Sequence, residues 1–141
     1  MNLILDRNKY SINNIYFNEC VKNTIMNDSN FIRIIYSNKD LILNGIHIKI
    51  NIYKEINQIK SDNYNNETLI FIQDLEKDLL NKYNKQKTQN NKIKEQLHYL
   101  INKINNSNVI TASYILKISG IWETSTNQGL TYKFIYLNDR Y

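Results

Sequence analysis

The most constraining feature of this chain is a strict alternation of apolar and polar side chains over residues 46–53. Isoleucine occupies every second position, and the positions between hold His47, Lys49, Asn51 and Tyr53. Because successive side chains of a strand point to opposite faces, this pattern predicts a half-buried strand with a basic and aromatic outer face. The preceding Asn44-Gly45 fits either a tight hairpin turn or a bulge that bends one long strand.

Further strands are predicted on both sides of this one. Residues 21–26 and 31–36 have strand-like patterns and flank a polar turn at residues 27–30, so they are predicted to form a hairpin. The densest apolar and aromatic stretch is residues 114–137. Two apolar runs there flank a polar segment that ends in Gly129, which predicts a closing hairpin with a long loop.

Two amphipathic helices are predicted between these strands. Apolar residues recur at spacings of three and four over residues 67–83, where Asn65 or Asn66 would cap the helix, and a second stripe follows from residue 93 to residue 104. The carboxylates of the first helix are expected to lie on a solvated face, and they are Asp74, Glu76 and Asp78.

The order of these elements predicts a fold. Strands segregated from helices favour an antiparallel sheet or small barrel, and the chain length suits one domain. Five main strands with helices between the third and fourth is the order of the OB-fold. We therefore predict a single, mainly β, OB-like domain over residues 1–141: a five-stranded antiparallel barrel with two helices inserted between strands 3 and 4.

Several classes of chemistry lack their sequence signatures. The chain contains three glycines, and none is followed by lysine. The sequence therefore contains neither a P-loop motif nor a glycine-rich dinucleotide-binding motif. Its serines lack the Gly-x-Ser-x-Gly elbow, and Cys20, His47 and His98 do not have zinc-site spacing. We expect no enzymatic activity, catalytic residue, cofactor or metal.

The charge and cysteine content indicate a setting and a partner. A formal charge of +5 and a pI near 9.2 favour an anionic partner. A single cysteine excludes an internal disulfide and favours a reducing, intracellular setting, and no apolar run approaches the roughly 18 residues of a membrane span.

Basic and aromatic residues interleave on the predicted strands, a pattern typical of proteins that bind single-stranded nucleic acid. Lysines track the phosphates, and aromatic rings stack bases at roughly 1–3 kcal/mol each. The alternative is that the aromatics at 132, 134 and 136 belong to the core. The candidate contacts from this reasoning are Lys49, Tyr53, Lys117, Trp122 and Lys133.

Three segments carry a resemblance to a known group. Residues 114–137, with Leu-Lys-Ile-Ser-Gly-Ile-Trp-Glu-Thr and Gly-Leu-Thr-Tyr-Lys-Phe, and residues 30–37 and 41–50 resemble small proteins encoded by large nucleocytoplasmic DNA viruses. That group is similar to compact phage-type single-stranded-DNA-binding proteins. The resemblance implies an OB-fold, a homodimer, phosphate contacts by Arg33 together with the lysines, and base stacking by Trp122.

One departure from the phage-type pattern concerns the end of the chain. Phage-type members end in an acidic tail that engages replication partners, whereas this sequence ends in Leu-Asn-Asp-Arg-Tyr. Recruitment of replication proteins through such a tail is therefore in doubt.

We expect a sequence-nonspecific single-stranded-DNA-binding protein that supports viral DNA replication, recombination or repair in the host cytoplasm, with replication proteins as possible partners. The alternative is a small viral structural or interaction protein that oligomerises through strand edges without binding nucleic acid.

Overall fold

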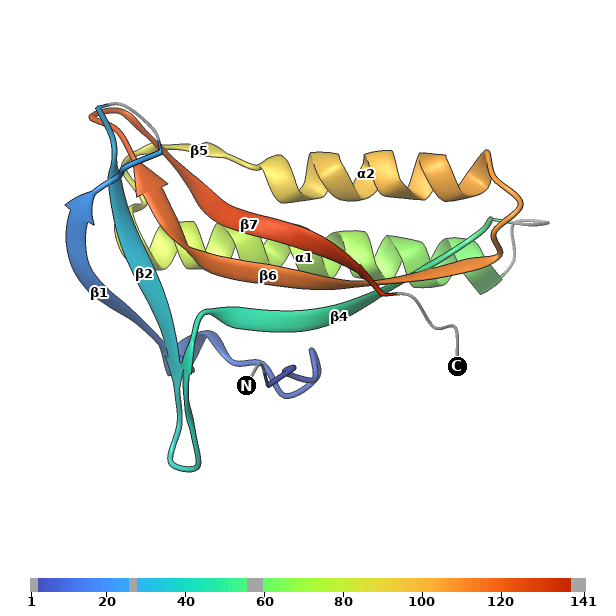
Figure 1. Ribbon diagram of the computed structural model, residues 1–141, viewed down its shortest axis with the longest axis horizontal. Helices are drawn as coiled ribbons and strands as arrows, with labels where there is room; N and C mark the ends of the chain where they lie inside the picture. The colour runs from blue at the N-terminus through green and yellow to red at the C-terminus, as the bar shows by residue number, and fades with distance from the viewer. Residues whose placement is uncertain (1–2, 26–27, 56–59, 138–141) are drawn as a thin grey trace.

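The computed structural model describes residues 3–25, 28–55 and 60–137, which form one mixed sheet with two helices on one face (Figure 1). In these residues the strands are β1 (Ile15–Lys22), β2 (Asn30–Ser37), β3 (Ile42–Asn44), β4 (Ile46–Tyr53), β5 (Thr88–Asn90), β6 (Thr111–Glu123) and β7 (Asn127–Leu137). The helices are α1 (Lys60–Asn84) and α2 (Lys92–Asn105), and a 3₁₀ turn spans Ile12–Asn14.

The sheet is organised around β6, the longest strand, which has two partners along one edge. Its first part pairs with β4 and its last part pairs with β2, both antiparallel, while β7 pairs along its other edge. The β2–β3 hairpin therefore diverges from β6 and projects from the rest of the molecule, at the bottom of Figure 1.

Gly45 lies in the fork between β2 and β6. Its N–H donates to the Ile34 carbonyl at 2.8 Å, and its φ of +82° is in the region that favours glycine. A Cβ atom there would lie 2.7 Å from the Ile118 carbonyl oxygen. Of the two alternatives for Asn44-Gly45, the bend in one long strand is therefore observed, because β3 pairs with β2 and β4 continues beside β6.

The core lies between the sheet and the two helices. The four isoleucines of β4 are at most 1% exposed, which confirms the predicted core face. They pack in one cluster with β2, β6 and the apolar stripes of both helices. Burying each such side chain contributes roughly 1.5–3 kcal/mol. Within the described segments, neither helix is long and apolar enough to cross a membrane.

The predicted OB-like barrel is wrong. The path β1-β2-β6-β7-β5 is an open sheet in which β1 and β5 stand at opposite ends and do not pair with each other in the described residues. β5 also pairs with β7 in parallel, so the sheet is mixed. In a closed barrel, side chains from the other strands would fill the interior against the isoleucine face. Here the two helices pack on that face instead and form a second layer.

Other boundaries differ in part. The closing hairpin is confirmed, but its predicted long loop is wrong, because the turn between β6 and β7 is residues 124–126 and Gly129 lies within β7. The second helix is confirmed, and α1 begins earlier than predicted, at Lys60. β1 runs from Ile15 to Lys22 and shares only residues 21–22 with the predicted strand, and residues 26–27 of the predicted first hairpin lie outside the described residues.

Asn65 is not a cap. Its amide nitrogen donates to the Tyr53 carbonyl at 2.7 Å and its amide oxygen accepts from the Tyr53 N–H at 3.2 Å, which joins α1 to the end of β4.

Glu76 also departs from prediction. Asp74 and Asp78 are exposed, but Glu76 is buried and accepts the N–H groups of Ile93 at 3.2 Å and Lys94 at 2.9 Å. Burial raises the pKa of Glu76, although the two N–H donors act in the opposite direction. This carboxylate serves as a cap for α2 supplied by α1.

We expect Gly45→Ala to lower the free energy of unfolding by about 2 kcal/mol or more, because it adds backbone strain and a contact with an immobile carbonyl. The urea midpoint measures this loss. Asn44→Ala, at the exposed neighbouring position, is the control and should change stability little. Equal effects of the two substitutions would contradict the role of Gly45 in the fork.

Candidate nucleic-acid interface

The face of the sheet opposite the helices carries all six residues predicted as nucleic-acid contacts. Residues paired across neighbouring strands share a face, so the register places the polar side of β4 with its partners on β6 and β7. A register shift at Ser119 separates the two halves of β6. The helices do not cover this face, and we call it the uncovered face, although His47, Ser113 and Ile115 at its centre are only 6–8% exposed. By register it carries Arg33, Lys49, Tyr53, Lys117, Trp122 and Lys133.

A basic row crosses the middle of this face. His47 of β4 pairs with Lys117 of β6, which pairs with Lys133 of β7. Because neighbouring strands lie about 4.8 Å apart, the three residues span roughly 10 Å, and Lys49 lies two residues from His47 on the same strand. We call these four residues the basic row. In the described part of the chain, the ion pairs are Lys87–Glu123 and Lys92–Glu95, outside the row.

The pairing of Lys117 with Lys133 is unfavourable for folding. Like charges directly opposite each other on two strands repel. No carboxylate lies on β4 or β7, and the one on β6, Glu123, already pairs with Lys87. On these three strands the Lys117–Lys133 pair therefore has no free carboxylate to balance it, and an anion would relieve its repulsion.

His47 was not among the predicted contacts. It is 6% exposed, and its Nε2 atom is buried without a hydrogen-bond partner among the described residues. Burial lowers the pKa of His47, and the adjacent Lys117 ammonium lowers that pKa further, so the imidazole is neutral near pH 7. The prediction that His47 lies on an exposed outer face is correct for the direction of its side chain and wrong for its exposure.

Arg33 lies on β2 across from Gly120 of β6. Its guanidinium carbon stands 5.6 Å from the centroid of the Phe31 ring, a cation–π distance, and Arg33 is exposed. The Phe31 ring in turn packs on Gly120, where a Cβ atom would lie 2.6 Å from two ring carbons. Phe31 is a site residue that the sequence reasoning missed.

Trp122 is half-buried because its indole packs on Gly129 across the hairpin. A Cβ atom on Gly129 would lie 2.6–2.7 Å from three atoms of the indole. An aromatic ring over a cross-strand glycine supports the sheet, so Trp122 has a structural role. One side of the Trp122 ring is occupied, as one side of the Phe31 ring is by Gly120, so Trp122 is at least suited to report on binding to this face.

Tyr53 has the register of this face, but it lies away from the row and its ring contacts α1. It lies six residues from His47, which along a strand is roughly 20 Å. Its ring packs edge to face on Tyr64 of α1, with centroids 4.6 Å apart. Lys49, Lys117 and Lys133 are thus brought together, whereas Tyr53 is not part of their cluster.

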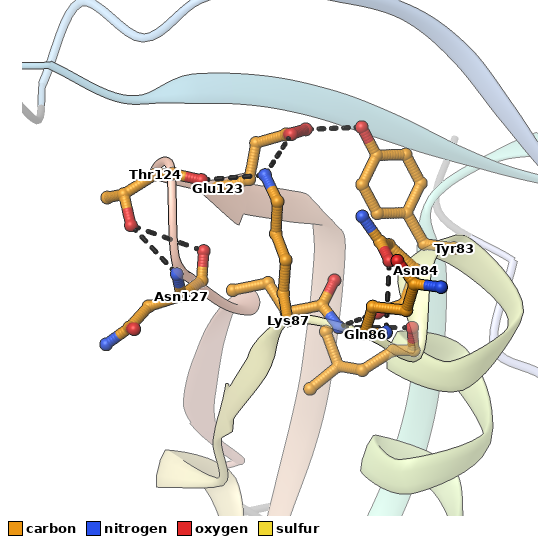
Figure 2. Close-up of polar contacts among 9 residues, drawn as sticks. Tyr83, Asn84, Gln86, Lys87, Glu123, Thr124 and Asn127 are labelled. Carbon is orange, nitrogen blue, oxygen red and sulfur yellow. Dashed lines mark hydrogen bonds and ion pairs between the residues drawn. The ribbon is translucent and has the colours of Figure 1, made fainter.

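The turn between β6 and β7 is held by a polar junction with the end of α1 (Figure 2). Lys87 Nζ lies 2.8 Å from a Glu123 carboxylate oxygen and donates to the Thr124 carbonyl at 2.7 Å, and Tyr83 Oη donates to Glu123. Within the turn, the Asn127 N–H donates to Thr124 Oγ1 at 3.0 Å. This junction fixes the strand end that carries Trp122 and neutralises Lys87.

The hydrogen bonds of the junction stabilise its charged carboxylate. Burial alone would raise the pKa of Glu123, but the hydrogen bonds from Lys87 and Tyr83 and the Lys87 charge hold that pKa below its ordinary value. Burial and the Glu123 carboxylate raise the pKa of Tyr83. The phenol is therefore neutral and acts as a donor.

The chain matches no protein-family model, no curated protein and no solved structure. Among the described residues, no three His, Cys, Asp or Glu side chains gather as potential metal ligands. The function must therefore be argued from the uncovered face itself.

We expect Lys133→Thr to raise the free energy of unfolding by about 0.2–1 kcal/mol, because it removes the repulsion across the hairpin and adds a residue that favours strands. The matched control is Lys49→Thr, which makes the same substitution opposite the uncharged Ile115. Urea unfolding at low salt measures both. An equal gain in the two variants would show that strand propensity, not relief of charge, is responsible.

Glu123→Gln tests the junction through its pH dependence. Because the folded-state pKa lies below the ordinary 4.5, the carboxylate stabilises the fold above that pH and loses its contribution as the pH falls through the folded-state value. We expect the variant to be about 1–3 kcal/mol less stable than wild type at pH 7, with a smaller gap in acid. Glu95→Gln, at an exposed ion pair, should show no such trend.

Proposed function

We propose that the uncovered face binds single-stranded nucleic acid without sequence specificity. The observation that carries this proposal is the basic row, in which Lys117 and Lys133 are directly opposite each other without a carboxylate partner among the described residues. Phosphates supply the missing negative charge and release their counterions on binding. The proposed activity is binding without catalysis.

The distribution of charge and aromatic rings supports the same face. Arg33, with Phe31 beneath its guanidinium, extends the basic row toward β2. Cations with adjacent rings suit a single strand, whose unpaired bases offer their faces for stacking. The correction of the barrel removes the OB-fold as an argument, so this proposal rests on surface chemistry.

The wider setting is part of the proposal. We propose a viral DNA-binding protein that acts as a homodimer in replication, recombination or repair in the host cytoplasm, with replication proteins as partners. Its support is the resemblance of the strand segments, the basic charge and the single cysteine.

A second candidate is an interaction protein that assembles through its strand edges. The observation in its favour is that β1 has β2 as its one partner in the described residues, with exposed Tyr16 and Val21 along it. Exposed apolar edges are sites of strand pairing between chains. A register irregularity between Phe17 and Cys20 interrupts this edge, which weakens it as a template.

Titration with oligo(dT) at low salt tests the first candidate through Trp122 emission. We expect quenching, and an affinity that falls as salt rises. Replacing Lys117 and Lys133 together by Glu should weaken binding and reduce the slope of log affinity against log salt by about 1.4, because roughly 0.7 ion is released per phosphate contact on a single strand.

The matched control replaces Lys77 and Lys85 by Glu, which changes net charge equally at exposed positions on α1 and in the segment after it. Equal weakening by control and test variants would indicate attraction to net charge alone. A stable oligomer that leaves oligo(dT) unbound would favour the second candidate.

A further inference from the structure

A mainly apolar groove of about 410 Å³ opens on the uncovered face beside the basic row. Its volume lies within the roughly 300–1,000 Å³ range of ligand sites. One wall comes from the end of β1 and the residues after it, and the floor comes from β2, β6 and β7. The residues that shape it most are Val21, Phe31, Arg33, Ser119 and Thr131.

The floor of the groove is created by two local irregularities of β6. At the register shift, Ser119 Oγ donates to the Thr131 carbonyl at 3.3 Å, and Gly120 follows without a side chain. The absence of a Cβ atom at Gly120 lets the Phe31 ring lie down on the strand. The ring therefore forms part of a depression instead of projecting into solvent.

Charge and shape in the groove match a nucleotide. Its lining combines an aromatic ring and aliphatic carbon with two cationic side chains, Arg33 and Lys22. A flat apolar base flanked by phosphates has the complementary arrangement, and Arg33 bears the donors suited to phosphate. Trp122 is not among the residues that line this groove.

We propose that this groove takes one unpaired nucleobase of the bound strand, with Phe31 as the stacking ring. In this proposal the Arg33 guanidinium, which stands over the Phe31 ring in the free protein, turns to the adjacent phosphate and leaves that ring face to the base. The proposal rests on the function proposed above and specifies how the face distinguishes single strands. A base within a duplex has both faces stacked and its edge paired, so it cannot enter the groove without being extruded. The basic row then holds the phosphates that follow.

Two polymers of equal length separate stacking from charge: oligo(dT) and its abasic deoxyribose-phosphate analogue. We expect the wild-type protein to bind oligo(dT) about 5- to 150-fold more tightly, the range for one stacked base. Phe31→Leu should remove most of this difference and leave both the abasic affinity and the salt slope unchanged, because no charge is altered. Retained binding of the abasic polymer shows that the variant is folded.

Tyr99→Leu is the matched control, since it removes an aromatic ring that is 60% exposed on α2, away from the groove. It should leave both affinities unchanged. The proposal is overturned if Phe31→Leu weakens both polymers equally or neither, or if the wild-type protein binds the two polymers equally while remaining salt-dependent. Failure of the wild-type protein to bind either polymer would instead overturn the proposed function.

Discussion

Burial of the β4 isoleucines beneath α1 and α2 is the interaction on which the rest of the structure depends. It decides which side of the sheet is covered, and because side chains alternate along a strand it also decides what the other side displays. His47 and Lys49 face away from the helices for this reason alone. The pairing of β4 with β6, and of β6 with β7, then places Lys117 and Lys133 on the same face as His47, side by side across the three strands.

Much of the local structure follows from the sequence because its signals act over short distances. Alternation identified β4 and its core face, and periodicity identified α2. The barrel was wrong because element order does not reveal that β6 has both β2 and β4 as neighbours. The predicted exposure of Glu76 was wrong for a similar reason. Its burial depends on where the start of α2 lies, and no pattern within α1 encodes that position.

Part of the candidate site could also be predicted from the sequence and part could not. Alternation within each strand placed Lys49, Lys117 and Lys133 correctly on one polar side. The alternation did not show that Tyr53 is distant from these lysines, nor that the ring of Trp122 packs on Gly129. Phe31 was overlooked because its importance comes from Gly120 on another strand. Residue types could be predicted, but neighbours across strands required the register.

The register shift at Ser119 changes which side chains of β6 point to each face of the sheet. Lys117 and Trp122 have opposite parity, and in an unbroken strand they would point to opposite sides of the sheet. The extra residue lets one continuous strand deliver a cation from its first half and an indole from its second half to a common surface. The presence of an extra residue at position 119 is therefore more constrained than its identity. Deleting it would turn each later side chain of β6 to the opposite face of the sheet.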